Sequence, residues 1–274
     1  MGPQRLGMIG YGAVAQAVVR HLAPYRLESE GGAVELQAIL VSPGGKKKDR
    51  PAPPDGIPLV DNLGEFLAMR HDLVVECAGQ QAVRMYAEQI LRAGADLIAI
   101  SMGAFADEAL LNRTMAAAKG SGTRVIIPTG AAGGLDILAA VRHDGIERVL
   151  FRSTKLPRAW MGTAAEAIVD LPALKEPVCF YRGNAREAAR SYPQSANVAA
   201  AVALAGIGFD RTEVELVADP AAGGNRNEIM AHGPFGSFEI KMLGKTRPEA
   251  PRTSISAPVS VVRSVLNRAS GFAI

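Results

Sequence analysis

The chain has 274 residues, of which 48% are hydrophobic, 21% charged and 5% aromatic. This length fits one large or two ordinary domains, and the apolar fraction is sufficient for a substantial core. The formal net charge of +3 is too small to indicate nucleic acid as a partner, and the one local basic cluster, 46–50, is typical of a solvated loop.

Cys77 and Cys179 are too few for a disulfide framework and lack the CxxC spacing of zinc or redox sites, so we expect no metal site. The N-terminus leads directly into an apolar strand, without the charged-then-apolar pattern of a signal segment. No apolar run approaches the roughly 20 residues that span a bilayer. We therefore expect a cytoplasmic protein without a membrane partner.

The first half of the chain alternates short apolar runs with segments of helical periodicity. After the first apolar run, Val14, Ala17, Val18 and Leu22 recur at the spacing of one helix face. Strands are expected at 6–9, 34–41, 73–77, 97–100 and 124–127, and helices at 13–22, 63–69, 82–93 and 107–119. Strands that alternate with helices of this length predict a parallel sheet with right-handed crossovers. The expected fold class is α/β, a Rossmann domain with a doubly wound parallel sheet.

After Gly130 the pattern changes, which predicts a second domain of the α+β class with an open sheet. Its expected strands are 148–154, 213–217, 227–232 and 237–242, and its expected Ala-rich helices are 185–190 and 197–205. The last apolar segment, 258–266, has helical spacing and is expected to pack back on the first domain. We therefore assign 1–130 to the first domain, 131–253 to the second, and about 254–274 to the returning helix.

The sequence GYGAVA, which follows the first strand, is the most informative short motif. Gly10 permits a tight strand-to-helix turn, Gly12 lets the backbone approach a pyrophosphate, and Ala15 allows close packing of helix on sheet. Ala13 and Val14 begin the helix, whose N-terminus offers free N–H groups and a partial positive charge to phosphates. Gly-rich turns without a ligand are common. The position between a strand and a helix nevertheless favours a dinucleotide-binding site in the first domain.

The end of the second strand bears on the choice between NAD and NADP. An NAD-preferring site usually has an acidic residue there, which binds the ribose hydroxyls. Ser42 occupies this place, and Lys46, Lys47, Lys48 and Arg50 follow it. A hydroxyl with nearby cations suits a 2′-phosphate, whereas the alternative is a basic surface loop without ligand contact. We expect Ser42 to contact the cofactor, and NADP to be accepted as well as NAD.

Further motifs lie downstream: VECAG (75–79), GAAGGLD (130–136), STK (153–155) with PRAW (157–160), YPQ (192–194) with ANVAA (196–200), VADP (217–220) and PRTS (251–254). In combination and in order, these motifs resemble the aspartate dehydrogenase family over most of the chain. The resemblance implies oxidation of L-aspartate to iminoaspartate with NAD or NADP, and the reverse reaction with ammonia. It also implies a homodimer in which the second domain binds the substrate and carries the dimer contacts.

By this resemblance, Ala131 and Asn197 match positions that bind the dinucleotide. The assignment is chemically sensible, because the backbone of a Gly-rich loop can approach the nicotinamide. The side-chain amide of an asparagine can both donate to the nicotinamide carboxamide and accept from it.

One position departs from the family pattern. The family places its catalytic histidine a few residues after VADP and before Glu-Ile, and here Asn227 stands in that place. An amide cannot carry a proton near neutral pH, whereas general acid–base catalysis is commonly worth roughly 10²–10⁴-fold in rate. His232 is not expected to compensate, because its odd offset along a strand points to the opposite face. The departure predicts an impaired enzyme if Asn227 is a substitution introduced at that position. The alternatives are a natural variant with different chemistry and a different register of the motif.

A substrate with two carboxylates calls for nearby cations. Lys155 and Arg158, in a Pro-containing stretch after a strand, are the substrate-binding candidates, and the alternative is a surface loop with solvated charges. Two further functions remain open. One is a dehydrogenase for another small amino or imino acid, and the other is a catalytically silent NAD(P)-binding protein, which Asn227 favours.

Overall fold

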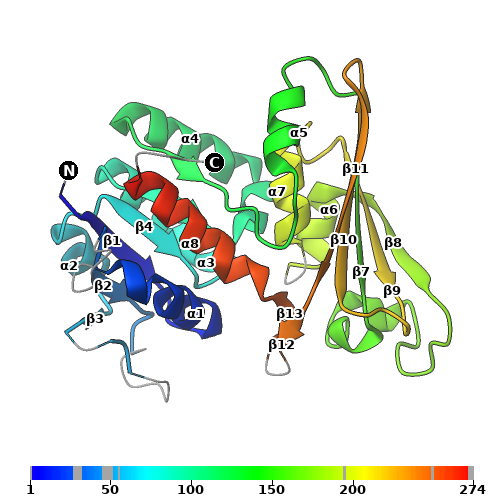
Figure 1. The fold of residues 1–274 in the computed structure, drawn as a ribbon, viewed down its shortest axis with the longest axis horizontal. Helices are drawn as coiled ribbons and strands as arrows, with labels where there is room; N and C mark the ends of the chain where they lie inside the picture. Colours follow the sequence, from blue (N-terminus) through cyan, green and yellow to red (C-terminus); the bar gives the residue numbers. More distant parts are fainter. Residues whose placement is uncertain are drawn as a thin grey trace. The chain divides into compact units, whose positions relative to one another are not determined.

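The computed structural model describes residues 2–26, 33–44, 52–54, 56–193, 196–247 and 250–270 (Figure 1). The chain divides into two compact units, one formed by Met1–Pro128 with Pro258–Ile274 and the other by Thr129–Ala257. None of the described helices is long and apolar enough to cross a membrane.

The first unit is built on a six-stranded sheet with the order β3-β2-β1-β4-β5-β6. Its strands are β1 (Gln4–Ile9), β2 (Val34–Leu40), β3 (Leu59–Val60), β4 (Leu73–Glu76), β5 (Asp96–Ala99) and β6 (Val125–Ile126). Every strand pairing in it is parallel. This topology confirms the predicted Rossmann fold. The strand order reverses between β1 and β4, which is where open α/β sheets bind ligands.

The helices of the first unit begin and end at residues that suit helix termini. They are α1 (Ala13–Leu22), α2 (Leu63–Ala68), α3 (Gln80–Arg92), α4 (Glu108–Ser121) and α8 (Ser256–Ala269). At the start of α4, the Asp107 carboxylate accepts a hydrogen bond of 3.1 Å from the N–H of Leu110. Gly122 ends the same helix with a φ of 67°, a left-handed conformation that glycine adopts without strain.

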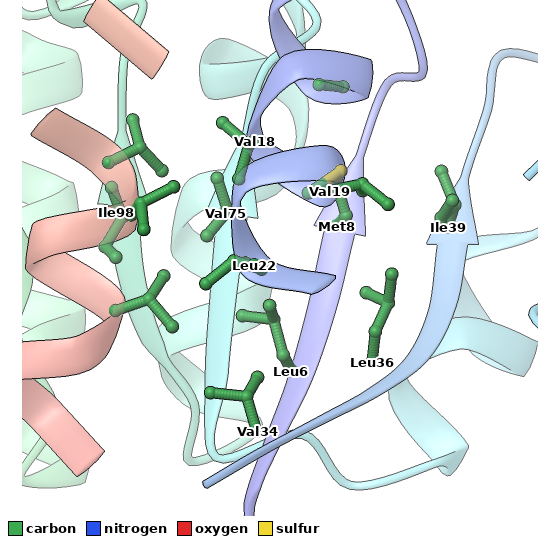
Figure 2. Packing of buried hydrophobic residues seen from close by; sticks show 14 of the residues in the cluster. Leu6, Met8, Val18, Val19, Leu22, Val34, Leu36, Ile39, Val75 and Ile98 are labelled. Atoms are coloured by element: carbon green, nitrogen blue, oxygen red, sulfur yellow. The ribbon is translucent and has the colours of Figure 1, made fainter. Parts of the chain in front are cut away.

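The core of this unit joins the sheet to α1 and α8 (Figure 2). Leu6 of β1 packs in the same buried cluster as Val18 and Leu22 of α1. The last helix of the chain, α8, contributes Val261 and Val265 to this cluster. Burying one such side chain contributes about 1.5–3 kcal/mol, so α8 is a stabilising part of the first unit.

The second unit contains a mixed five-stranded sheet with the order β11-β10-β7-β9-β8. Its strands are β7 (Arg148–Lys155), β8 (Val178–Asn184), β9 (Thr212–Ala218), β10 (Asn225–Gly233) and β11 (Gly236–Gly244). β7 and β9 are parallel, and the other pairs are antiparallel. The helices are α5 (Leu135–Val141), α6 (Ala185–Ser191) and α7 (Asn197–Ala205), and a small pair, β12 (Thr246–Arg247) and β13 (Ala250–Ser254), precedes α8.

Four of these elements, β8, α5, β12 and β13, lie in segments that the sequence prediction left unassigned. In β8 the register shifts between Cys179 and Tyr181, so the apolar residues do not alternate regularly. In α5 the helix has only seven residues, too few to establish a helical period in the sequence.

The two faces of the second sheet have different surroundings. Helices α5, α6 and α7 lie on one face (Figure 1). Phe151 of β7 is fully buried, and it points away from Arg148 and Arg152 because alternate residues of a strand point to opposite sides. On the opposite face, Arg148 and Arg152 of β7 pair with Glu213 and Glu215 of β9, at 2.7 Å and 2.6 Å. We call this second surface the open face.

A buried histidine makes the stability of the first unit sensitive to pH. The His71 ring packs against Phe66 with 4.2 Å between ring centroids, and its Nδ1 lies 2.9 Å from Oε1 of Gln37. A Cβ on Gly7 would come within 2.7 Å of this ring, so the glycine is required here. Burial lowers the pKa of His71 to about 4, and the ring is therefore neutral in the folded protein at neutral pH.

We predict that acid destabilises the protein through His71. Between about pH 6.5 and pH 4 the unfolded chain binds a proton at this position that the folded chain does not, so stability falls as the pH decreases. The loss is on the order of 1–3 kcal/mol across this window. Urea unfolding of His71→Gln should show a flatter pH dependence, whereas the exposed control His21→Gln should keep the original slope. An unchanged slope in His71→Gln would contradict the assignment.

Candidate active site

The glycine turn between β1 and α1 brings the backbone close to the neighbouring strand. Gly10 has a φ of 84°, and a Cβ at this position would lie 2.8 Å from Cβ of Ala78. Only glycine fits both constraints. Around a Cβ placed on Gly12, by contrast, no heavy atom of the described residues lies within 4 Å. The turn therefore packs tightly against Ala78 at Gly10, and it leaves free space beside Gly12 at the start of the helix.

The N-terminus of α1 is chemically suited to an anion. Its first turn contains no acidic residue, and its N-cap, Gly12, has no side chain to hydrogen-bond the helix amides. These N–H groups and the helix dipole could therefore bind an anion without competition from a carboxylate of the first turn. Ala15 is fully buried, as close packing of the helix on the sheet requires.

A cleft of 460 Å³ lies at the carboxyl ends of β1, β2 and β4, beside this turn. Gly10, Gly12 and Ser42 line it, as the dinucleotide prediction requires. Ala13 and Val14 are the first two residues of α1. The other lining residues were not predicted as cofactor contacts, and they are Ile9, Tyr11, Leu40, Val41, Cys77, Ala78, Gln81, Ala82, Met85 and Tyr86. Lys46, Lys47, Lys48 and Arg50, which supported the NADP argument, lie outside the described residues.

Glu76 stabilises the backbone turns beside the cleft. Its carboxylate is buried at the end of β4 and accepts hydrogen bonds from the N–H groups of Ala78 and Gly79, at 2.8 Å and 2.7 Å. It also accepts from the N–H and the hydroxyl of Ser101 after β5, both at 3.0 Å. Burial raises the pKa of Glu76, and the hydrogen bonds from Gly79, Ser101 and Ala78 oppose that shift. One carboxylate thus holds the turns after β4 and β5 together.

The second unit contains a cluster of buried polar side chains around Asn227. This residue pairs with Ser153 across β10 and β7. The Ser153 hydroxyl donates to Oδ1 of Asn227 at 2.9 Å, and Nδ2 of Asn227 donates to the carbonyl of Ala131 at 2.8 Å. Because a carbonyl can only accept, the contact with Ala131 fixes the orientation of the amide. Asn227 therefore ties the two strands to the loop that contains Ala131.

The loop around Ala131 depends on glycine. Gly130 and Gly134 have φ values of 64° and 77°, and a Cβ on Gly134 would clash with the side chain of Ile240. The amide of Ala132 donates to the carbonyl of Thr129 at 3.1 Å, which closes a turn. This backbone is held in one conformation, as a loop that positions a ligand must be.

The two predicted substrate-binding cations have different surroundings. Lys155, at the end of β7, is 5% exposed, and its Nζ lies 4.6 Å from the ring centroid of Trp160. A solvated loop charge, the alternative raised from sequence, is therefore wrong for Lys155. Arg158 lies in the short 3-10 helix Pro157–Ala159 and is exposed. For Arg158 the solvated alternative stays open.

The remaining predicted residues occupy distinct positions. Asn197 is the first residue of α7 and is half-buried. His232 lies near the hairpin end of β10, 64% exposed, with Nδ1 3.0 Å from a carboxylate oxygen of Glu147. It therefore does not share the buried surroundings of Asn227. Ser153 and Trp160, which contact Asn227 and Lys155, were not predicted as site residues.

Comparison with known proteins identifies relatives of both units. Residues 136–268 match the family described as aspartate dehydrogenase, C-terminal, and residues 10–128 match the homoserine dehydrogenase NAD binding domain. An L-aspartate dehydrogenase of Ralstonia pickettii is 39% identical over 270 residues, which cover 98% of this chain and 99% of that protein. One of Cupriavidus necator is 45% identical over 205 residues, 75% and 77% of the two chains. The crystal structure of aspartate dehydrogenase from Thermotoga maritima aligns with a TM-score of 0.77 and 27% identity, covering 100% of both chains.

We predict that Glu76→Gln weakens the binding of NADH by about tenfold or more. An amide cannot accept at both of the positions where the carboxylate does, and a buried donor left unpaired costs about 1–3 kcal/mol. The turns beside the cleft should then leave their binding conformation, and 1.4 kcal/mol corresponds to a factor of ten in affinity. Calorimetric titration with NADH measures this loss. The exposed control Glu108→Gln should bind NADH as tightly as the unmodified chain does. An unchanged affinity in Glu76→Gln would show that Glu76 does not hold the turns in their binding conformation.

Proposed function

The chain belongs to the L-aspartate dehydrogenase family, and from that premise we propose that it oxidises L-aspartate to iminoaspartate with NAD or NADP, reversibly with ammonia. The observation that carries the proposal is the match along the whole chain, 39% identity over 98% of its length to a protein of that name. We also propose a cytoplasmic location, where thiols such as the free Cys77 and Cys179 stay reduced.

In this proposal the first unit holds the cofactor. Backbone amides at Gly12, Ala13 and Val14 receive the pyrophosphate, because the turn is open there and the helix begins without a cap. Ser42 lines the same cleft, where its hydroxyl can meet the ribose or its phosphate. When bound, NAD or NADP supplies the hydride acceptor for the reaction.

The second unit supplies the groups for the amino acid. The buried side chain of Lys155 and the exposed guanidinium of Arg158 are the proposed contacts for the substrate. Ala131 and Asn197 are the proposed contacts for the nicotinamide end of the cofactor. The carbonyl of Ala131 is already engaged by Asn227, so that loop needs no rearrangement to present its remaining backbone groups.

Asn227 favours one other function, a protein that binds the dinucleotide without turnover. Its amide cannot exchange a proton near neutral pH, although it occupies the position of the family's catalytic histidine. A third candidate, a dehydrogenase for another small amino or imino acid, would share the whole first unit. Turnover separates these three functions.

We expect L-aspartate to reduce NAD or NADP in the presence of the purified chain, measured as absorbance of the reduced cofactor. D-aspartate is the matched control and should give no reduction. Reduction by another small amino acid alone would identify a different substrate. Reduction only after Asn227→His would identify a dehydrogenase that has lost its acid–base group. Dinucleotide binding without turnover in either form would identify the silent binder.

We further propose that the chain forms a homodimer through the open face. Leu150 and Met230 are half-buried there beside the ion pairs of β7 with β9, and a hollow of 350 Å³ lies among them. A surface that carries both signs of charge and apolar side chains can pair with its own copy about a two-fold axis.

This assembly predicts a mass in solution twice that of one chain, about 57 kDa from the chain mass of 28.7 kDa. Leu150→Glu, at the centre of the open face, should yield monomers, because it places a carboxylate in the apolar part of the contact. Met115→Glu changes an exposed methionine of the first unit and should remain dimeric. Light scattering coupled to gel filtration measures all three, and a monomeric unmodified chain would refute the proposal.

A further inference from the structure

Oxidation of an amino acid requires a group that takes a proton from the substrate ammonium. Four buried polar side chains share the helix-covered face of the second sheet: Ser153 and Lys155 from β7, and Asn225 and Asn227 from β10. They share this face because alternate residues of a strand point to the same side. The hydroxyl and the two amides do not exchange protons near neutral pH, whereas the lysine amine can. Lys155 is thus the proton-exchanging member of this group.

Lys155 is also close to Asn227. Ser153 is directly opposite Asn227, and Lys155 is two residues further along the same strand. Diagonal neighbours of this kind in an antiparallel pair lie about 7–8 Å apart, a distance that a lysine side chain spans. The amine can therefore reach the part of the site that Asn227 occupies.

An aromatic platform fixes the lysine in place. Trp160 is fully buried, and its Nε1 donates to the carbonyl of Val217 at 3.0 Å. Phe180 and Tyr192 pack edge-on against its ring, with centroids 4.9 Å and 6.5 Å away. Nζ of Lys155 lies 4.6 Å from the centroid of this ring, which defines its place at the end of β7. Buried lysine amines are used as general bases in enzymes.

Asn227, in contrast, is occupied by a structural role. Its Oδ1 accepts from Ser153 and its Nδ2 donates to the carbonyl of Ala131. The oxygen and the amino group are therefore both used in connecting the two strands to the loop. Asn227 is a positioning residue. A proton acceptor other than Asn227, either a side chain or water, is therefore required.

We propose that Lys155 is the general base of the reaction, an inference that rests on the proposed function. The neutral amine of Lys155 takes one proton from the α-ammonium of L-aspartate. As the Cα–H bond breaks, the hydride passes to the oxidised pyridine dinucleotide as co-reactant, and the electron pair left on nitrogen forms the C=N bond of iminoaspartate. The proton ends on Nζ of Lys155, from which water removes it.

The test compares Lys155→Met and Lys155→Arg with the unmodified chain. Both substitutions should lower kcat/KM for L-aspartate by about 10²–10⁴-fold, because neither side chain accepts a proton near neutral pH. Lys175→Met, an exposed lysine of the same unit, is the control and should leave the rate unchanged. Thermal unfolding and NADH titration of each variant establish that the fold and the cofactor site are intact.

Two further readouts separate a base from a cation that only holds a carboxylate. Succinate, a dicarboxylate without the amine, should bind Lys155→Met within about threefold of the unmodified chain. Adding Asn227→His to Lys155→Met should restore turnover, and the rising limb of the pH profile should move toward the histidine range near 6.5. Full activity in Lys155→Arg, or loss of succinate binding in Lys155→Met, would overturn the proposal and assign Lys155 to carboxylate binding.

The two proposals fail in different ways. If the unmodified chain turns over L-aspartate and Lys155→Met does so equally well, the general-base assignment is wrong and the proposed function stands. If neither the unmodified chain nor Asn227→His turns over L-aspartate, both proposals are wrong.

Discussion

The close approach of Gly10 to Ala78 is the constraint on which the first unit depends. The turn after β1 must pass within van der Waals contact of the turn after β4, and only a residue without a Cβ permits this at a φ of 84°. Glu76 fixes the other side of that contact, since its carboxylate holds the amides of Ala78 and Gly79. Burying the Glu76 carboxylate removes it from water, which is unfavourable. The four hydrogen bonds that it accepts offset this desolvation energy, and they form only when the turns after β4 and β5 are both in place. The shape of the cleft is therefore tied to the ionisation and packing of one side chain.

The second unit organises its polar cluster in a comparable way. Ser153, Asn227 and the carbonyl of Ala131 form a chain in which each group has a defined donor or acceptor role. Buried polar groups that are satisfied in this way rigidify their surroundings, whereas a half-satisfied group destabilises them. The packed rings of Trp160 and Phe180 likewise limit the movement of Lys155, whose Nζ lies over the Trp160 ring. Both devices fix side chains before any ligand arrives, which is the condition for an accurate binding geometry.

Much of this arrangement could be predicted from sequence where the signal is local. The glycine turn, its strand and its helix occupy a continuous stretch, and the structure places Gly10, Gly12 and Ser42 on one cleft. The Asn227 network could not be predicted in this way, because its partners lie 74 and 96 positions away in the chain. Nζ of Lys155 lies over the ring of Trp160, and a charged residue after a strand carries no local sign of that contact. The β8 strand was missed because a bulge interrupts its alternation.

By the resemblance to the family, position 227 is that of a catalytic histidine, and an asparagine there would separate two roles that a single side chain can combine. A neutral imidazole has one donor and one acceptor nitrogen, and an amide has a donor and an acceptor as well. Either side chain can therefore accept from Ser153 and donate to Ala131, so the connection between strand and loop survives the exchange. The proton-exchanging ability does not survive, because the amide has no pKa near neutral pH. With asparagine at this position the proton acceptor must be another group, and the proposed one, Lys155, lies two residues along the adjacent strand.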